Sequence, residues 1–303
     1  MKARVVKSTG NWYLIQPQTG DLLKARIRGK FRLDNIQHTN PVAVGDHVEY
    51  ETDKDGLALI TKIEERKNYI IRRSVNLSKK THIIASNIDR AFLIVTLENP
   101  RTSSGFIDRF LVTAEAYHIP VSIVINKMDL YDEKLLKEAE ELSELYKHTG
   151  YEVIAVSAIR GDNIALLRSK LTNKVSLFSG HSGVGKSTLM NVFHPDLDTK
   201  TAEVSDFNKK GQHTTTFAEM HPWPFGGYCI DTPGIKEFGL AEMEPEEVGD
   251  YFPEIHRTKS DCKFHNCMHL NEPQCAVRKA VSKGEIAKSR YRNYLIFVEE
   301  LSE

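Results

Sequence analysis

Long apolar runs are missing from this sequence of 303 residues, which contains no stretch of about 18 consecutive apolar residues. The first residues, Met1–Lys7, are partly basic but lead into polar residues rather than into an apolar segment. These two absences exclude a transmembrane helix and a signal peptide. We therefore expect a cytoplasmic protein without a membrane partner, and we expect it to be a monomer.

Cysteine is scarce and net charge is absent, since the chain has four cysteines and its 41 Lys and Arg balance its 41 Asp and Glu. Four cysteines without an export signal do not indicate a disulfide scaffold. The charge balance hides a segregation, because residues 1–82 carry a net charge of +7 and residues 83–245 carry −6. The basic end is either a surface for a polyanion or an ordinary solvated face.

Residues 1–67 are predicted to form a β-barrel that resembles the OB-fold. Short alternating runs between turn residues predict five strands and no helix, at 3–7, 12–16, 22–28, 47–51 and 58–63. Basic residues that share one face of an extended chain follow at every second position: Lys24, Arg26, Arg28, Lys30 and Arg32. With Trp12, Tyr13 and Phe31 nearby, this face favours RNA binding over a merely solubilising role.

Residues 68–82 are predicted to be a basic linker, because they contain several Lys and Arg and few residues that favour regular structure. Residues 83–245 then alternate between strand and helix patterns, which predicts an α/β domain. The expected strands are 91–96, 121–125, 152–156, 175–179 and 228–230, and the expected helices are 107–118, 133–149 and one that includes 188–193.

A glycine-rich loop lies between an expected strand and an expected helix and matches the phosphate-loop pattern. It reads Gly180, His181, Ser182, Gly183, Val184, Gly185, Lys186 and Ser187, followed by Thr188. Its backbone N–H groups and the helix N-terminus attract phosphate, while Lys186 adds a full charge and Ser187 offers a hydroxyl to Mg²⁺. The alternative is a glycine turn that matches by chance.

A second motif, Asn126-Lys127-Met128-Asp129, follows the expected strand at 121–125. The carboxylate of Asp129 can accept hydrogen bonds from both the ring N–H and the exocyclic amine of guanine, a pair that adenine lacks. We expect Asn126 and Lys127 to brace the pocket and cover the base. Ser157-Ala158 ends the next expected strand, where a backbone N–H can contact the guanine oxygen.

The remaining nucleotide motifs come after the phosphate loop. The polar stretch 209–216 holds Thr215, which we prefer to Thr214 as a Mg²⁺ ligand, and Asp231-Thr232-Pro233-Gly234 follows the last expected strand. In that loop Asp231 holds Mg²⁺ through water, and the Gly234 N–H is placed for the γ-phosphate. Mg²⁺ with GTP is therefore expected at Ser187, Thr215 and Asp231.

Residues 246–303 contain a candidate metal site. Three cysteines and two histidines occur within residues 262–275, at a spacing that suits one structural zinc ion. We expect Cys262, Cys267, His269 and Cys275 as ligands, with His265 as the alternative to His269. The segment 277–300 is predicted to form one helix, which docks on the central domain, on RNA, or on both.

Together these features resemble the ribosome small-subunit-dependent GTPase A (RsgA) family. Three features carry the resemblance over essentially the whole chain. They are the barrel, the position of Asn126-Lys127-Met128-Asp129 (the guanine tetrad) ahead of the phosphate loop, and the pattern Cys262-x4-Cys267-x-His269-x5-Cys275. It implies a multidomain fold: an N-terminal OB-like barrel, a central circularly permuted P-loop GTPase domain, and a small helical zinc-binding domain. It also implies a GTPase that binds the 30S subunit and its 16S rRNA late in maturation and hydrolyses GTP to GDP when stimulated by it.

The sequence departs from the Ras-like pattern at the residue that orients the attacking water. Ile235 follows the Asp-x-x-Gly loop, where Ras-like enzymes have a glutamine, and its side chain cannot form hydrogen bonds. The family pattern suggests His213 for this role, beside Lys186 and Thr215, and the alternative is a solvated loop histidine. Two other functions stay open: a GTP-sensing RNA-binding module with negligible turnover, and an ATP-using P-loop protein.

Overall fold

The computed structural model divides the described chain into two compact units, which we describe separately. The first contains residues 1–91, 164–179 and 185–237, and the second contains residues 92–163, 180–184 and 238–303. The residues that the structure describes are 1–10, 12–28, 41–54, 56–73, 81–195, 218–231 and 243–302. Within these residues, no helix has the length and apolar character that a membrane crossing requires.

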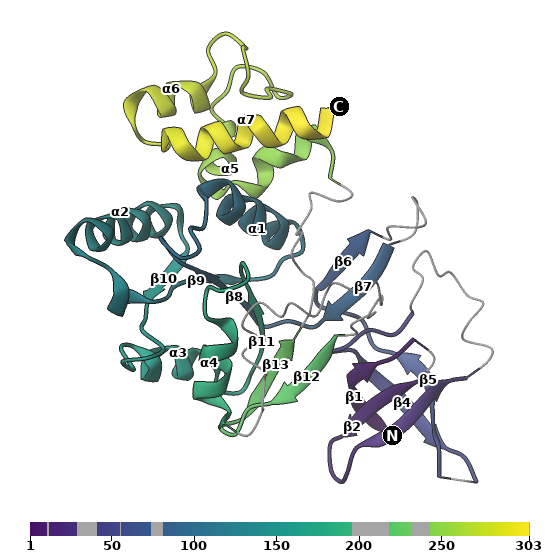
Figure 1. Cartoon of the computed structure of the whole chain (residues 1–303). Helices are drawn as coiled ribbons and strands as arrows, with labels where there is room; N and C mark the ends of the chain where they lie inside the picture. Colours follow the sequence, from purple (N-terminus) through teal and green to yellow (C-terminus); the bar gives the residue numbers. More distant parts are fainter. Residues whose placement is uncertain are drawn as a thin grey trace, which may run out of the picture. The chain divides into compact units, whose positions relative to one another are not determined.

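The five strands at the N-terminus form a closed barrel, as predicted (Figure 1). Their order is β1-β2-β3-β5-β4, and β4 pairs back onto β1. Alternating side chains fill the barrel, among them Val5, Tyr13 and Ile15, each at most 2% exposed. The strands are β1 (Lys2–Ser8), β2 (Tyr13–Pro17), β3 (Leu23–Ile27), β4 (His47–Thr52) and β5 (Ala58–Ile63).

The segment predicted as a basic linker contains regular structure, so the expectation of few structural elements there is wrong. The strands β6 (Tyr69–Arg73) and β7 (Thr81–Ser86) form an antiparallel pair. The buried carboxylate of Asp46 connects them to the barrel, since it accepts hydrogen bonds from Arg66 Nε at 2.7 Å and from Ser86 Oγ at 2.6 Å. The predicted domain boundaries themselves stay predictions.

The first unit also carries the strand and helix on either side of the phosphate loop. Strand β11 pairs in parallel with β13, which pairs in antiparallel with β12. Asp89 fixes the start of this sheet, because its carboxylate accepts from Val175 N at 2.8 Å. The elements are α3 (Ile164–Leu171), β11 (Lys174–Ser179), α4 (Lys186–Phe193), β12 (Glu219–Pro222) and β13 (Gly227–Asp231).

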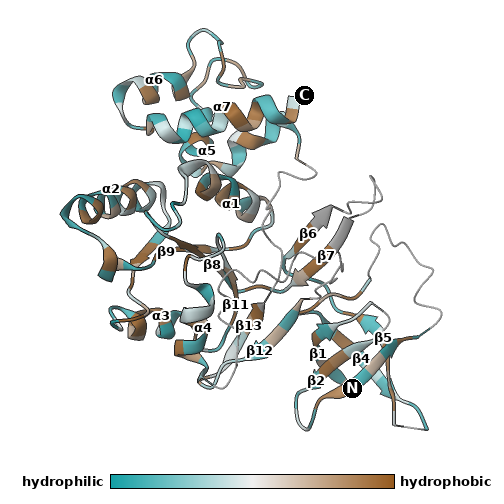
Figure 2. Cartoon of the chain, viewed as in Figure 1, coloured by the Kyte–Doolittle hydropathy of each residue, from teal (hydrophilic) through white to brown (hydrophobic). Residues whose placement is uncertain are grey.

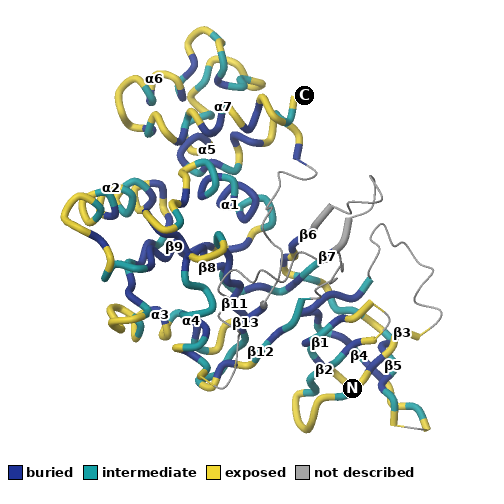
Figure 3. The backbone as a smooth tube through the Cα atoms, in the orientation of Figure 1, coloured by how far each residue is buried: buried dark blue, intermediate teal, exposed yellow. Residues whose placement is uncertain are grey.

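The second unit contains three adjacent strands in the order β10-β9-β8. Strand β8 after Arg90 and strand β9 are mostly apolar and buried (Figures 2 and 3), as expected for central strands of an α/β sheet. Helix α2 has an exposed, charged face, and Asp132 and Gly150 cap its two ends. The elements are β8 (Arg90–Val95), α1 (Ser104–Ala116), β9 (Val121–Ile125), a 3-10 turn η2 (Met128–Leu130), α2 (Glu133–Thr149) and β10 (Glu152–Ala155).

The C-terminal part of the second unit is helical, but the single helix predicted over 277–300 is wrong. The chain forms two helices, because Gly284 adopts a left-handed conformation (φ +79°) and its N–H bonds back to the end of the first helix. A glycine in this conformation ends a helix. The elements are η5 (Pro245–Tyr251), α5 (Pro253–Lys259), α6 (Ala276–Lys283) and α7 (Lys288–Ser302).

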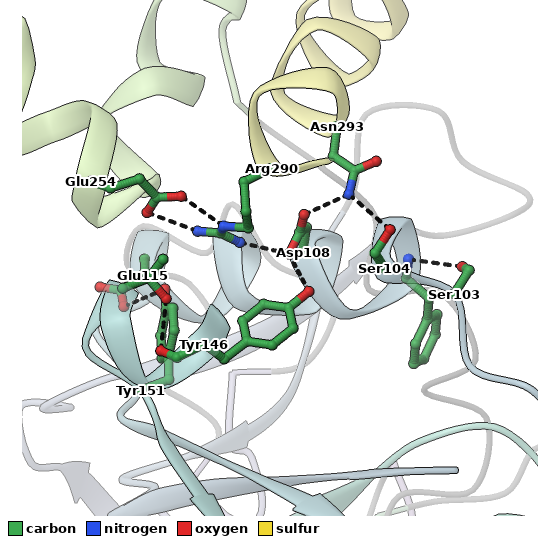
Figure 4. Close-up of polar contacts among 11 residues, drawn as sticks. Ser103, Ser104, Asp108, Glu115, Tyr146, Tyr151, Glu254, Arg290 and Asn293 are labelled. Carbon is green, nitrogen blue, oxygen red and sulfur yellow. Dashed lines mark hydrogen bonds and ion pairs between the residues drawn. The ribbon is translucent and has the colours of Figure 1, made fainter. Parts of the chain in front are cut away.

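A buried polar network attaches this helical part to α1 (Figure 4). The guanidinium of Arg290 on α7 bonds Asp108 of α1 at 2.6 Å and Glu254 of α5 at 2.7 and 3.0 Å. Asp108 also accepts from Asn293 Nδ2 at 2.5 Å and from the Tyr146 hydroxyl at 2.7 Å. The C-terminal helix therefore docks on the central domain, and its contact with RNA stays a prediction.

Candidate functional site

The phosphate-loop sequence occupies the strand-to-helix turn that its pattern predicts. It follows β11, and Gly185 (φ +96°) is the N-cap of α4, which begins at Lys186. Gly180 has a φ of +142°, and a Cβ atom there would lie 2.2 Å from the carbonyl oxygen of Ile94. Only glycine fits at this position, because any side chain would collide with the backbone of β8.

The phosphate loop also contacts the chain that leads into α1. The ring of His181 packs against that of Phe106 in the first turn of α1, with ring centroids 3.9 Å apart and a tilt of 31° between the rings. A Cβ atom on Gly183 would lie 3.4 Å from Pro100, so this loop and the segment after β8 are in close contact. Neither Phe106 nor Pro100 belongs to a nucleotide-binding motif, so the sequence alone does not predict these contacts.

The guanine tetrad meets the phosphate loop through Asn126. Its side-chain nitrogen donates to the carbonyl oxygen of Val184 at 2.9 Å, and its side-chain oxygen accepts from Ala158 N at 3.3 Å. Asp129 accepts a hydrogen bond from Ser157 Oγ at 2.5 Å. Three motifs that are separate in the sequence, at 126–129, 157–158 and 180–184, therefore converge within the second unit.

Lys127 and Tyr131 hold the tetrad against the segment that follows β8. Lys127 has a left-handed backbone (φ +66°), and its ammonium group donates to the Asn99 carbonyl oxygen at 2.6 Å. The hydroxyl of Tyr131 donates to the Asn126 carbonyl oxygen at 2.9 Å and accepts from Leu97 N at 2.8 Å. No local sequence motif predicts this bridge by Tyr131, because its partner Leu97 lies 34 positions away.

The expected Mg²⁺ and γ-phosphate residues are described only in part. Ser187 and Thr188 lie in the first turn of α4, and Asp231 is the last residue of β13. His213, Thr214, Thr215 and Gly234 lie outside the described residues, so their predicted roles stay predictions.

The candidate metal ligands of the C-terminal part lie together. The Sγ atoms of Cys262, Cys267 and Cys275 and a ring nitrogen of His269 all fall within 4.8 Å of one another. His269 is 3% exposed, whereas His265 is exposed and outside the cluster. Two tyrosines fix the intervening loop, since Tyr291 donates to the His269 carbonyl oxygen and Tyr294 to that of Met268.

The dimensions of this cluster fit a tetrahedral metal ion. The Sγ atoms of Cys262 and Cys275 are 3.9 Å apart, and they lie 3.6 and 3.5 Å from His269 Nδ1. A tetrahedral zinc ion with ordinary bond lengths requires about 3.8 Å between two sulfurs and about 3.5 Å between sulfur and nitrogen. Burial raises the pKa of Cys267, and a bound cation would favour the thiolate form of that side chain.

The basic face of the barrel is present where β3 is described. Lys24, Arg26 and Arg28 are exposed, while Ala25 between them is buried. The Arg26 guanidinium lies 3.5 Å from the centroid of the Trp12 ring, which is 38% exposed. Tyr13 points into the barrel core, and Lys30, Phe31 and Arg32 lie outside the described residues. The described face combines cations with one accessible aromatic ring.

Comparison with known proteins gives matches over the whole chain. A family model described as RsgA GTPase matches residues 63–241, and one described as RsgA N-terminal domain matches residues 2–60. Two similar proteins are both named small ribosomal subunit biogenesis GTPase RsgA. The one from Bacteroides fragilis is 53% identical and covers 100% of this chain and 98% of its own. The one from Christiangramia forsetii is 53% identical and covers 99% and 96%.

Two solved structures are also similar. The crystal structure of YjeQ from Thermotoga maritima matches with a TM-score of 0.81 and 38% identity, covering 99% of this chain and 98% of its own. The structure of YloQ, described as a circularly permuted GTPase, matches with a TM-score of 0.78 and 32% identity, covering 99% and 94%. The motif order in this chain agrees with the description of the second structure as a circularly permuted GTPase.

Proposed function

The chain belongs to the RsgA family of GTPases, and we propose that it hydrolyses GTP to GDP and phosphate during maturation of the small (30S) ribosomal subunit. The single observation that supports this most is the hydrogen bond from Asn126 to Val184. It joins the guanine tetrad to the phosphate loop, although the two lie in the reverse of the usual order along the chain.

Guanine recognition is the first part of the proposal. Asp129 accepts from the ring N–H and amine of guanine, while Ser157 holds the carboxylate in place. Asn126 and Lys127 brace the pocket, and a backbone N–H at Ser157-Ala158 donates a hydrogen bond to the guanine oxygen. In the described structure the Ala158 N–H bonds to Asn126, which places that loop beside the tetrad.

Phosphate binding and hydrolysis form the second part. The backbone of Gly180–Gly185 surrounds the phosphates, Lys186 neutralises their outer oxygens, and Ser187, Thr215 and Asp231 are the residues to hold Mg²⁺. The bound cation would offset charge on the phosphates. His213 orients the attacking water, because Ile235 cannot do so. We expect hydrolysis to be slow until the small ribosomal subunit binds.

RNA contact and the C-terminal metal centre complete the proposal. The face formed by Trp12, Lys24, Arg26 and Arg28 suits binding to 16S rRNA through phosphate charge and base stacking. Cys262, Cys267, His269 and Cys275 would hold one structural zinc ion, which supplies no chemistry and fixes their loop. The protein would act in the cytoplasm as a monomer.

Release of phosphate from GTP, measured with and without purified 30S subunits, tests the function. We expect stimulation by 30S but not by 50S subunits, and co-sedimentation with 30S that depends on whether GDP or a non-hydrolysable GTP analogue is bound. GTP binding without turnover in either condition would instead identify a nucleotide-sensing RNA-binding module.

The role of His213 has its own test. His213→Ala should bind GTP normally but lose most subunit-stimulated turnover, whereas His148→Ala, on the exposed end of α2, should behave as the wild type. If His213→Ala kept full stimulated turnover, the assignment of the water-orienting residue would be wrong.

A further inference from the structure

Tyr131 bridges two buried backbone groups beside the guanine tetrad. Its side chain follows the η2 turn and is 9% exposed. Its hydroxyl donates to the carbonyl oxygen of Asn126 and accepts from the N–H of Leu97, and these residues are 1% and 2% exposed. Water cannot easily replace either bond, because both partners lie in the interior.

The two groups that Tyr131 joins belong to the two segments that frame the base pocket. Asn126 opens the tetrad and bonds the phosphate loop at Val184. Leu97 opens the loop 97–102, which accepts a hydrogen bond from Lys127 through the Asn99 carbonyl oxygen. The same loop contacts the phosphate loop at Gly183 through Pro100. The Tyr131 hydroxyl therefore connects the tetrad to the loop 97–102, which also contacts Lys127 and the phosphate loop.

We propose that Tyr131 is a positioning residue for guanine recognition, an inference that rests on the proposed function. The η2 turn is short, and Asp129 lies two residues before Tyr131 within it. Fixing the Asn126 carbonyl two residues before this turn and the Tyr131 ring directly after it fixes the backbone that carries the Asp129 carboxylate. Tyr131 acts on the base only through this backbone, since its hydroxyl is already committed to two partners.

Tyr131→Phe is the variant that tests this role, because it keeps the ring and removes only the hydroxyl. The N–H of Leu97 and the carbonyl of Asn126 then each lose a hydrogen-bond partner, and the backbone of the tetrad shifts. Nucleotide binding must then return the Asp129 carboxylate to its position, which costs binding free energy. We expect the affinity for GDP to fall about tenfold. We also expect the preference for GDP over IDP to fall, because IDP lacks the exocyclic amine that Asp129 recognises.

Tyr151→Phe is the matched control. Tyr151 is also buried, at 7% exposed, and its hydroxyl bonds Glu115 Oε1 of α1 at 3.0 Å. Tyr151 lies just before β10, whereas Ser157 and Ala158 of the site lie after it. Both variants should lose similar thermal stability, but only Tyr131→Phe should change the GDP to IDP affinity ratio. Calorimetric titration of GDP and IDP into the wild type and both variants, below the lowest melting temperature, gives these values.

The outcomes separate this inference from the proposed function. A wild type that binds neither nucleotide contradicts the proposed function itself. A wild type that binds GDP, with a Tyr131→Phe variant that keeps the GDP to IDP ratio, contradicts the positioning role. A change of that ratio in Tyr151→Phe as large as in Tyr131→Phe would also contradict it.

Discussion

Replacing Arg290 by methionine should strongly destabilise the second unit. Arg290 is 1% exposed and bonds two buried carboxylates, Asp108 (0% exposed) and Glu254 (6%). Burial lowers the pKa of Arg290, but the two carboxylates more than compensate and raise it above its ordinary value. Arg290→Met keeps most of the apolar volume but leaves both carboxylates buried without their cation.

The expected loss is large because removing one partner of a buried ion pair costs about 3–5 kcal/mol. Since Arg290 serves two acceptors, we expect roughly 5 kcal/mol, which lowers the melting temperature by about 10–20 °C for a unit of this size. Thermal unfolding followed by circular dichroism measures the midpoint, and urea unfolding gives the free energy.

Arg109→Met is the control for this experiment. Arg109 pairs with Glu300 at 2.8 Å and also lies over an aromatic ring, but both members of the pair are partly exposed. A pair of this kind contributes at most about 1 kcal/mol. Adding Asp108→Asn to the Arg290 variant should restore part of the stability, because it removes one unpaired charge. If Arg290→Met were no more destabilising than Arg109→Met, the structural role of the network would be refuted.

Three further predictions concern pH, metal and the phosphate loop. Burial raises the pKa of Asp89, but hydrogen bonds from Lys67 and a backbone N–H outweigh this and lower it below the ordinary value. Its contribution to stability is therefore present above about pH 4 and lost as the pH falls through the lower folded-state pKa, so Asp89→Asn should flatten the acid side of a melting-temperature profile. Treatment with a metal chelator, or Cys275→Ser, should release one equivalent of metal and lower the melting temperature of the C-terminal helices without changing GDP affinity; a metal content of zero in the purified protein would contradict the site. Gly180→Ala should abolish nucleotide binding or folding, because its Cβ would lie 2.2 Å from the Ile94 carbonyl, and a variant that binds GDP normally would contradict the described loop.

Local signals were enough to predict most elements of the fold. The strand at 121–125 and the helix at 133–149 have the predicted bounds, because one is an unbroken apolar run and the other has a capping Asp132 and a terminal Gly150. The five barrel strands are found within one or two residues of their predicted positions. In each case the sequence within a few positions of the element is sufficient to determine it.

Predictions failed where charge or distant contacts outweighed local pattern. The strands β6 and β7 were missed because basic residues dominate the segment and hide its Ile pairs. The residues around Arg290 give no sign that this arginine is buried, because its partner Asp108 lies 182 positions away. The contact of Tyr131 with Leu97 was missed for the same reason, because its hydroxyl bonds a distant backbone N–H that no local pattern reveals.

Calorimetric titration of GDP and ADP into the full chain and its Asp129→Asn variant tests the central claim most directly. The account predicts that the wild type binds GDP far more tightly than ADP, and that Asp129→Asn loses most of this preference while it still folds. Equal affinity of the wild type for GDP and ADP, or an unchanged preference in the variant, would contradict a single guanine nucleotide site formed by the tetrad and the phosphate loop.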